Sequence, residues 1–208
     1  MSCELAEFIG VMYGDGNLHI DNKHSYRLVI SLNKDKDAEY AQFIQKRFTE
    51  LFGLQLRTYT YKNKSLLMLR CYSKKLVYHL HEEFNLPIGK KQHLGIPAAV
   101  QESNYAFAFI RGLIDTDGCT YTRTTQGYSY PVVKFTNTNQ LLAHQVAENL
   151  RSIGMQPVIT RKHARANKHA LDVVLNGQKQ LRMYQDFIGT NNPRNKKGTE
   201  GFEPPICR

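Results

Sequence analysis

The chain has 208 residues, of which 28 are Lys or Arg and 18 are Asp or Glu, so its formal net charge is +10. An apolar fraction of 41% and an aromatic fraction of 11% are typical of a folded protein and exclude a disordered basic tail. No apolar run approaches the roughly 20 residues that span a membrane, and the N-terminal segment MSCELAEFIG lacks the features of a signal peptide. We therefore expect a soluble intracellular protein of the cytoplasm, nucleoid or an organelle matrix, not secreted and with no membrane partner.

The basic excess has two interpretations, namely solubility alone or a polyanionic partner, most often nucleic acid. The cysteines Cys3, Cys71, Cys119 and Cys207 are far apart in the sequence, which excludes a CxxC pair and the ligand spacing of a zinc site. We expect them to be core thiols in a reducing compartment.

Apolar periodicity predicts the order αββαββα for the first part of the chain. The ranges are a helix over 3–14, strands over 17–21 and 26–33, a helix over 36–51, strands over 54–62 and 65–72, and a helix over 74–84. The order then returns, with a helix over 103–116, strands over 119–125 and 131–137, a helix over 139–152, strands over 155–163 and 170–175, and a helix over 178–188. Strands joined as meanders predict antiparallel sheets and an α+β class.

An internal repeat explains why the order of elements returns. Three pairs of segments match in the same order at nearly constant separation: FIGVMYGDG at 8–16 with IRGLIDTDG at 110–118, FGLQ at 52–55 with IGMQ at 153–156, and IGKK at 88–91 with RNKK at 194–197. A period of about a hundred residues indicates a tandem duplication and not a solenoid. We predict a first half over 1–84, a linker over 85–102 that contains Pro and Gly, and a second half over 103–208.

The two matching helices carry small residues four positions apart, a spacing that lets helix backbones approach closely. We expect the helices to pack against each other on a pseudo-two-fold axis, through Gly10, Gly14, Gly112 and Thr116. Gly16 and Gly118 follow the helices where a C′ glycine ends a helix.

Asp15 and Asp117 then emerge side by side at the C-terminal ends of these helices. A carboxylate is unfavourable at that end of a helix, by up to about 1 kcal/mol, and two adjacent carboxylates also repel each other, so that one tends to protonate. A shared divalent cation would compensate, and oxygen ligands with open positions suit Mg²⁺.

FIGVMYGDG and IRGLIDTDG resemble the two signature helices of the LAGLIDADG family of homing endonucleases, in its monomeric branch with two motifs per chain. The resemblance extends over nearly the whole chain. It implies two four-stranded sheets that form a saddle on double-stranded DNA, and hydrolysis of both strands across the minor groove to leave short 3′ overhangs. Tyr13 departs from the motif, at a position that faces a helix in the family, so we expect no loss of activity.

The resemblance also implies roles for individual residues. Asp15 and Asp117 are the catalytic carboxylates and the ligands of Mg²⁺, for which Mn²⁺ is a plausible substitute, together with the backbone of Gly14 and Thr116. Lys91 and Lys197, chosen from the pairs 90–91 and 196–197, are the expected catalytic lysines, although contact with phosphate alone is the alternative. Asn33 and Asn137 are candidates for orienting water.

Alternating strands also predict a polar sheet face that can contact base edges, with basic hairpin tips for phosphates. The expected DNA-binding residues are Arg27, Ser31, Gln55, Arg57, Tyr59, Tyr61, Lys62, Lys64, Arg70, Tyr72, Tyr121, Arg123, Lys134, Gln156, Thr160, Lys162, Arg165 and Asp172. The register of VVKFTN around 131–137 stays open.

The leading hypothesis is a site-specific endonuclease with a long asymmetric DNA target, encoded within an intron. The alternative is an intron RNA maturase on the same fold, with or without cleavage. A transcription regulator of similar descent would have lost the carboxylates, and an intein-embedded nuclease has no support from flanking splicing segments.

Overall fold

The computed structural model describes residues 1–21, 24–161 and 170–197. In the first half the elements are α1 (Cys3–Gly14), β1 (Gly16–Ile20), β2 (Tyr26–Asn33), α2 (Ala38–Phe52), β3 (Arg57–Thr60), β4 (Leu66–Tyr72) and α3 (Lys74–Phe84). They are followed by a 3₁₀ turn, η1 (Ala98–Val100), and by α4 (Ser103–Asp117), β5 (Gly118–Thr125), β6 (Tyr128–Asn137), α5 (Gln140–Ser152), β7 (Val158–Arg161), β8 (Leu171–Asn176), α6 (Gln178–Phe187) and α7 (Pro193–Lys197). The α+β class and the repeated αββαββα order are confirmed.

Each half contains one antiparallel four-stranded sheet, as predicted, but the strands do not form a simple meander. Their orders are β1-β2-β4-β3 and β5-β6-β8-β7. In each half a helix follows the second strand and carries the chain to the sheet edge. The fourth strand then returns beside the second, as in the pairing of Val29 with Arg70 and of Lys134 with Val174.

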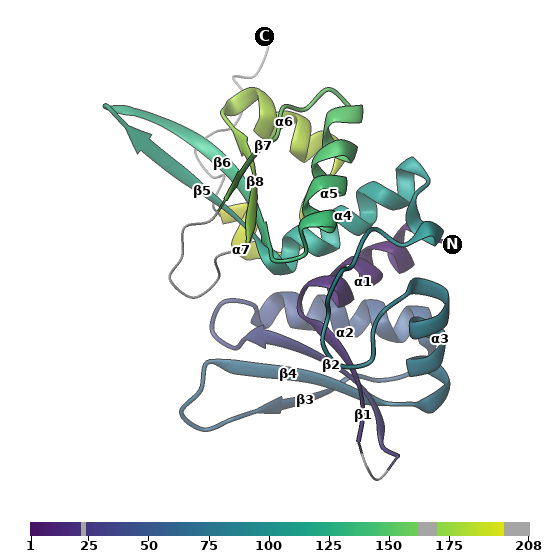
Figure 1. Ribbon diagram of the computed structural model, residues 1–208. Coiled ribbons are helices and arrows are strands. Elements are labelled where there is room, and N and C mark those ends of the chain that lie inside the picture. The colour runs from purple at the N-terminus through teal and green to yellow at the C-terminus, as the bar shows by residue number, and fades with distance from the viewer. Residues whose placement is uncertain (22–23, 162–169, 198–208) are drawn as a thin grey trace.

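Alternation along the strands fixes which sheet face is buried. Leu28, Ile30 and Leu32 of β2 are buried against the helices. In the second half Val133 and Phe135 belong to the core, which settles the register that the sequence left open. Figure 1 shows the helices α2 and α3 on one side of the first sheet and α5 and α6 on one side of the second.

Two edge strands are shorter than predicted, because helix side chains bind the backbone that precedes them. The predicted strands over 54–62 and 155–163 are only Arg57–Thr60 and Val158–Arg161, and positions 162 and 163 lie outside the described residues. Gln45 of α2 donates to the Leu56 carbonyl at 2.9 Å, and the Gln156 amide donates to Gln180 of α6 at 2.9 Å. The short helix α7 and the turn η1 were not predicted.

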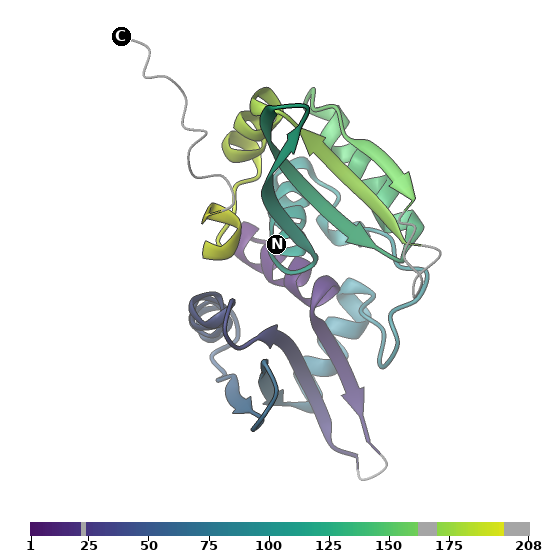
Figure 2. The same cartoon turned by 90° about the vertical axis from the view of Figure 1, so that its left-hand side faces the viewer.

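Helices α1 and α4 pack against each other between the two sheets, as Figure 2 shows for α1. A Cβ on Gly10 would lie 2.9 Å from the Leu113 amide nitrogen, and a Cβ on Gly112 would lie 3.0 Å from that of Val11. Real Cβ atoms do not approach backbone so closely. Glycine at these positions therefore permits the contact between the two backbones.

Gly16 and Gly118 do not act as left-handed helix-ending glycines, which corrects the expectation from sequence. The residue that caps α1 is Asp15, and Gly118 has φ −104° and ψ 175°, which is extended backbone. Both glycines avoid a clash instead: a Cβ on Gly16 would lie 2.5 Å from the Cα of Met12, and one on Gly118 would lie 2.5 Å from the Ile114 carbonyl oxygen. The absence of a side chain lets each strand turn back directly over its helix.

Within the described ranges, none of the helices combines the length and the apolar character that crossing a bilayer requires.

Candidate active site

The ends of α1 and α4 bring Asp15 and Asp117 together. Gly14 lies against Thr116, and the carboxylate carbon of Asp117 is 3.6 Å from where a Cβ on Gly14 would stand. Asp117 therefore extends across to the end of α1. The two carboxylates come from residues 102 positions apart, as the repeat predicted.

Both carboxylates hold protons more tightly than a free Asp. Burial and the neighbouring charge of Asp117 raise the pKa of Asp15 to about 7. Burial likewise raises the pKa of Asp117 to about 6, opposed by Lys91 and by the hydrogen bond from Asn137. Two ionised carboxylates at this distance repel each other, so the site favours either a proton or a cation beside them.

Lys91 is the cation at the end of α1. Its Nζ donates to the carbonyl oxygens of Tyr13 at 2.9 Å, Met12 at 3.2 Å, and Gly14. Burial lowers the pKa of Lys91, while Asp117 and Asp15 act in the opposite direction. The ammonium group therefore neutralises both the helix end and the carboxylates.

Lys197, the expected counterpart of Lys91, does not have this position. It is exposed and borders a surface hollow with Asp35, Lys36 and Glu39. The cation at the end of α4 is Arg194, whose Nη2 donates to the carbonyl oxygens of Thr116 at 3.4 Å and Gly118 at 3.5 Å. The match of IGKK with RNKK paired Lys91 with Lys197. In the structure, α7 instead places Arg194, the first residue of RNKK, at the end of α4.

The two asparagines also differ. Asn137 donates from Nδ2 to Oδ2 of Asp117 at 3.0 Å. Asn33 instead accepts from the amides of Asp35 and Lys36, and so shapes the turn before α2. Within the described contacts, only Asn137 of this pair binds either of the paired carboxylates.

A buried polar network behind the carboxylates was missed by sequence reasoning. Glu7 of α1, 2% exposed, pairs with Arg111 of α4 at 3.0 Å and accepts from Asn191 at 2.6 Å. Asp115, fully buried, accepts from the hydroxyl of Thr190 and from the Asn191 amide at 2.8 Å. The signal was Asp115 itself, an acidic residue on the inner face of a packed helix, which needs buried donors.

Tyr13 takes the place of Asp115 in the first half. Its hydroxyl donates to the Phe84 carbonyl at 2.9 Å, and its ring packs against Phe109. The departure from the motif is thus accommodated by a bond to the end of α3.

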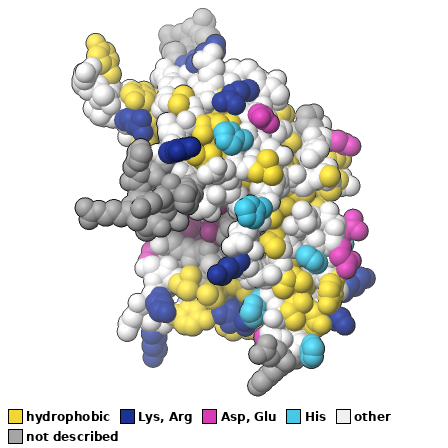
Figure 3. All heavy atoms as spheres, viewed as in Figure 1, with side chains coloured by type: hydrophobic (Ala, Val, Ile, Leu, Met, Phe, Trp, Pro, Cys, Tyr) yellow, Lys and Arg dark blue, Asp and Glu magenta, His cyan; other side chains and the backbone are white. Residues whose placement is uncertain are grey.

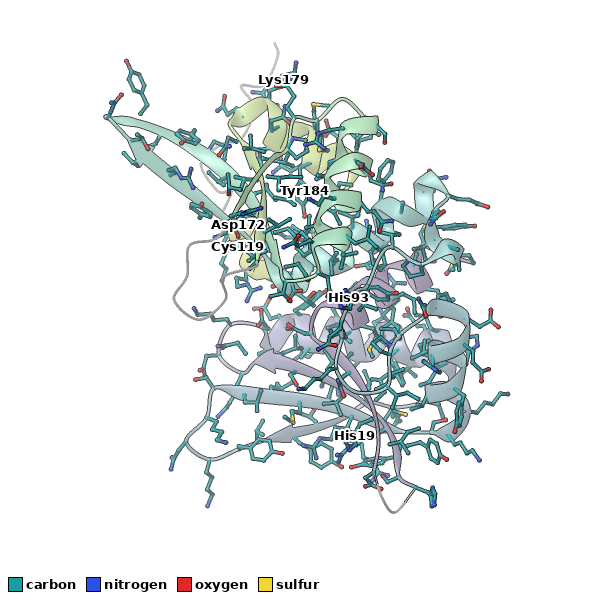
Figure 4. All side chains as sticks on the ribbon, in the orientation of Figure 1. His19, His93, Cys119, Asp172, Lys179 and Tyr184 are labelled. Carbon is teal, nitrogen blue, oxygen red and sulfur yellow. The ribbon has the colours of Figure 1, made fainter. Side chains whose placement is uncertain are left out.

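The sheet faces turned away from the helices carry most of the residues expected to bind DNA. Strand registers place these residues on one outer face: Arg27, Ser31, Arg57, Tyr59, Arg70 and Tyr72 in the first sheet, and Tyr121, Arg123, Lys134, Thr160 and Asp172 in the second. Figure 4 labels Asp172 and Cys119 on the second sheet and His19 on the first. His19, opposite Arg27, was not predicted.

The remaining predicted DNA contacts lie in loops or outside the described residues. Gln55 precedes β3, Gln156 precedes β7, and Tyr61, Lys62 and Lys64 lie in the exposed turn between β3 and β4. Lys162 and Arg165 lie outside the described residues. In Figure 3, Lys and Arg side chains are visible on both halves, with acidic atoms set back between them.

Aromatic rings hold several basic side chains in place. The guanidinium of Arg70 lies 4.5 Å from the ring centre of Tyr59 and donates to the Tyr61 hydroxyl at 2.6 Å. Arg123 lies over Tyr121, to whose hydroxyl it donates at 2.9 Å. Such stacking reduces the rotamer freedom that a contact to a base would cost.

The donor set suits a divalent cation with few protein ligands. No group of three His, Cys, Asp or Glu side chains able to hold a metal occurs in the parts of the chain that the structure describes. The available hard oxygen donors are the two carboxylates and the carbonyls of Gly14 and Thr116. Both carbonyls already accept hydrogen bonds from cationic side chains. Mg²⁺ prefers such sites, because it keeps waters and phosphate oxygens as its other ligands.

The fold and the paired acidic helices define an α+β protein of two pseudo-symmetric halves with a shared acidic centre. Residues 104–189 match the family model described as a LAGLIDADG-like domain. The second half of the chain therefore carries a LAGLIDADG-like domain. No curated protein sequence matches it.

Solved structures share this fold over most of the chain. Mesophilic variants of the homing endonuclease I-DmoI superpose with a TM-score of 0.62 at 17% identity, covering 89% of this chain and 88% of that one. I-DmoI in complex with DNA and Mn superposes with a TM-score of 0.59 at 18% identity, covering 90% of this chain and 96% of that one. The I-LtrWI LAGLIDADG homing endonuclease bound to target DNA superposes with a TM-score of 0.63 at 12% identity, covering 94% of this chain and 88% of that one.

Proposed function

We propose that the protein is a site-specific DNA endonuclease that makes a double-strand break by Mg²⁺-dependent hydrolysis of one phosphodiester bond in each strand. The observation that carries the proposal is the junction of Asp15 and Asp117 at the ends of two packed helices, with Lys91 beside them. Similar structures were solved with target DNA, and with Mn or Mg present.

Asp15 and Asp117, with the main-chain oxygens of Gly14 and Thr116, would hold the metal. When bound, Mg²⁺ supplies a Lewis acid that activates water and neutralises charge on the phosphate. Mn²⁺ has the same preference for oxygen donors and would substitute. The raised pKa values of both carboxyl groups mean that each must lose its proton before it binds a cation.

The nearby polar side chains would orient the reacting groups. Asn137 donates a hydrogen bond to one oxygen of Asp117 and would hold that carboxylate in a fixed orientation. Lys91 supplies positive charge that stabilises the phosphate as it becomes more negative. This chain's contribution is therefore preorganised charge on two rigid helix ends.

The outer sheet faces would bind the duplex on either side of this centre. Arg27, Arg57 and Arg70 lie on one sheet and Arg123 and Lys134 on the other. Both halves belong to one chain, so one copy supplies both carboxylates and the protein would act as a monomer. Different side chains on the two sheets favour an asymmetric target.

The test begins with duplexes selected for binding from a randomised library in Ca²⁺, and then incubated with Mg²⁺ or with EDTA. Cleavage in Mg²⁺ alone is expected for wild type. Asp15→Asn and Asp117→Asn should each prevent the double-strand break, whereas Asp35→Asn, which removes an exposed carboxylate, should not. If both active-site variants still cut both strands, the paired-carboxylate site is wrong. Tight binding to folded intron RNA without DNA cleavage would favour a maturase.

A further inference from the structure

Among the residues that the structure places in strands, Asp172 of β8 is the only Asp or Glu, and it lies on the second sheet (Figure 4). Its neighbours Leu171 and Val173 belong to the core, so alternation along the strand turns Asp172 to the outer face. Charged side chains that share the outer faces with it are basic, such as Arg70 on one sheet and Lys134 on the other. A carboxylate in this place opposes the phosphates that these faces would bind.

Asp172 is held in place by the neighbouring strand. Thr136, its partner in β6, donates from Oγ1 to Oδ1 of Asp172 at 2.6 Å. Within the described ranges no Lys or Arg side chain forms an ion pair with this carboxylate. The charge is therefore not accounted for by a described cation beside it, while one oxygen is fixed and the other can accept a hydrogen bond from a ligand.

The equivalent place in the first half has no charge. Ser31 and Thr136 each follow the residue that pairs with the glycine at the start of β1 or β5. Ser31 pairs with Met68, whereas Thr136 pairs with Asp172. The two sheets therefore present different chemistry at equivalent places, a thioether in the first half and a carboxylate in the second.

The edges of the four bases in the major groove differ in what they offer a carboxylate, which can only accept hydrogen bonds. Guanine presents two acceptors, and thymine presents an acceptor and a methyl group. Adenine presents an amino donor beside an acceptor, whereas cytosine presents its N4 amino donor alone. An ionised Asp on a surface that contacts base edges therefore favours cytosine.

We propose that Asp172 is a specificity-determining residue that recognises a cytosine in the DNA target and lowers the affinity for other sequences. Thr136 is the residue that positions it. The inference rests on the proposed endonuclease function and adds a base preference to it. A basic side chain on the sheet strengthens binding to every duplex, but the carboxylate repels phosphates everywhere and is compensated only where an amino group pairs with it.

The experiment selects duplexes from a randomised library in Ca²⁺ with wild type and with Asp172→Asn. Sequences selected by wild type should share a cytosine at one position, where those selected by Asp172→Asn carry adenine, because an amide pairs with N6 and N7 of that base. The other positions should keep their bases. The asparagine oxygen can still accept from Thr136, so the contact between β6 and β8 is preserved. Identical base preferences at every position would overturn the inference, whether or not the protein cleaves DNA.

Fluorescence anisotropy in Ca²⁺ measures the two effects on affinity. Replacing the selected cytosine by thymine should weaken binding of wild type by about tenfold and binding of Asp172→Asn by less than about twofold. On a duplex of unrelated sequence Asp172→Asn should bind about threefold more tightly than wild type, since a repelling charge is removed. Asp35→Asn, which removes an exposed carboxylate from the turn before α2, is the matched control. An equal gain from both variants would reduce the effect to net charge and contradict the inference.

The readouts separate this inference from the endonuclease proposal. If Asp172→Asn prevents cleavage in Mg²⁺ but keeps the cytosine preference, the carboxylate belongs to the metal centre and the inference is wrong. A wild type that selects cytosine through Asp172 and never cleaves DNA would contradict only the endonuclease.

Discussion

Asn137 donates from Nδ2 to Oδ2 of Asp117 at 3.0 Å, a bond that has no counterpart at Asp15 among the described contacts. Asn33, which aligns with Asn137 in the repeat, instead accepts from the amides of Asp35 and Lys36. One asparagine supports a carboxylate and the other a turn. The duplicated sequence has therefore acquired two different local structures.

Asn137→Ala should slow cleavage of the Asp117-dependent strand by about tenfold, because a carboxylate released from its hydrogen bond is less well oriented. Asn33→Ala should leave both strand rates nearly unchanged and lower the free energy of unfolding by about 1 kcal/mol through the lost turn bonds. Strand-resolved nicking and urea unfolding measure the two effects. Equal loss of nicking in both variants would show that the repeat preserves one role.

Asp15 and Asp117 should make the stability of the metal-free protein fall as pH rises. Their folded-state pKa values, about 7 and about 6, lie above the ordinary value of 3.8. Between about pH 4 and pH 7 the folded protein therefore holds protons that the unfolded chain has released. The stability that this proton binding contributes is lost as the pH rises through the folded-state pKa values.

The double variant Asp15→Asn with Asp117→Asn should accordingly be more stable than wild type at pH 8, by about 2 kcal/mol, and nearly equal to it at pH 4. Urea unfolding in EDTA at several pH values measures the difference. Asp35→Asn controls for the loss of negative charge alone. Some pH dependence should remain in the double variant, because burial also raises the pKa of Asp115 to about 6. A difference that is constant with pH would contradict the electrostatic explanation.

The helices, strands and buried faces could be predicted from the sequence, because apolar spacing along a short stretch of chain determines them. The alternation of Leu28, Ile30 and Leu32 determines the buried face of β2. The repeated Asp-Gly predicted which carboxylates the structure brings together. Strand order was not predictable from hairpins, since pairing of β2 with β4 depends on contacts across α2.

The contacts among Asp37, Asn192 and Arg194 could not be predicted from local sequence patterns. Asn192 and Asp37 are separated by 155 residues, and neither belongs to a recognisable motif. Lysine was matched to lysine in the repeat, yet the α7 helix rotates Lys197 to the surface and Arg194 to the end of α4. Side-chain partners at such separation follow from packing, which one sequence does not specify.

Gly10→Ala should destabilise the junction of the two halves. The new Cβ would lie 2.9 Å from the Leu113 amide nitrogen, closer than side-chain carbons approach backbone, so α1 and α4 must separate. The expected loss is about 2 kcal/mol or more in the free energy of unfolding, measured by urea denaturation. Gln42→Ala, on the exposed face of α2, is a control that should change stability little. If Gly10→Ala unfolds at the same urea concentration as wild type, the helices are less closely packed than described.

Lys62 and Lys64 should contribute affinity without sequence preference, in contrast to Arg57 on the outer face of β3. Lys62→Ala with Lys64→Ala removes two charges from an exposed turn that would contact phosphates. The slope of log affinity against log salt should therefore fall by about 2, equally for matched and mismatched duplexes. Arg57→Ala should cost about 1–3 kcal/mol on the selected duplex and less on a duplex altered at the base pair it contacts. Fluorescence anisotropy in Ca²⁺ over a series of salt concentrations distinguishes them. Uniform weakening by Arg57→Ala across all duplexes would assign that arginine to the phosphates and leave base recognition to other residues of the sheet.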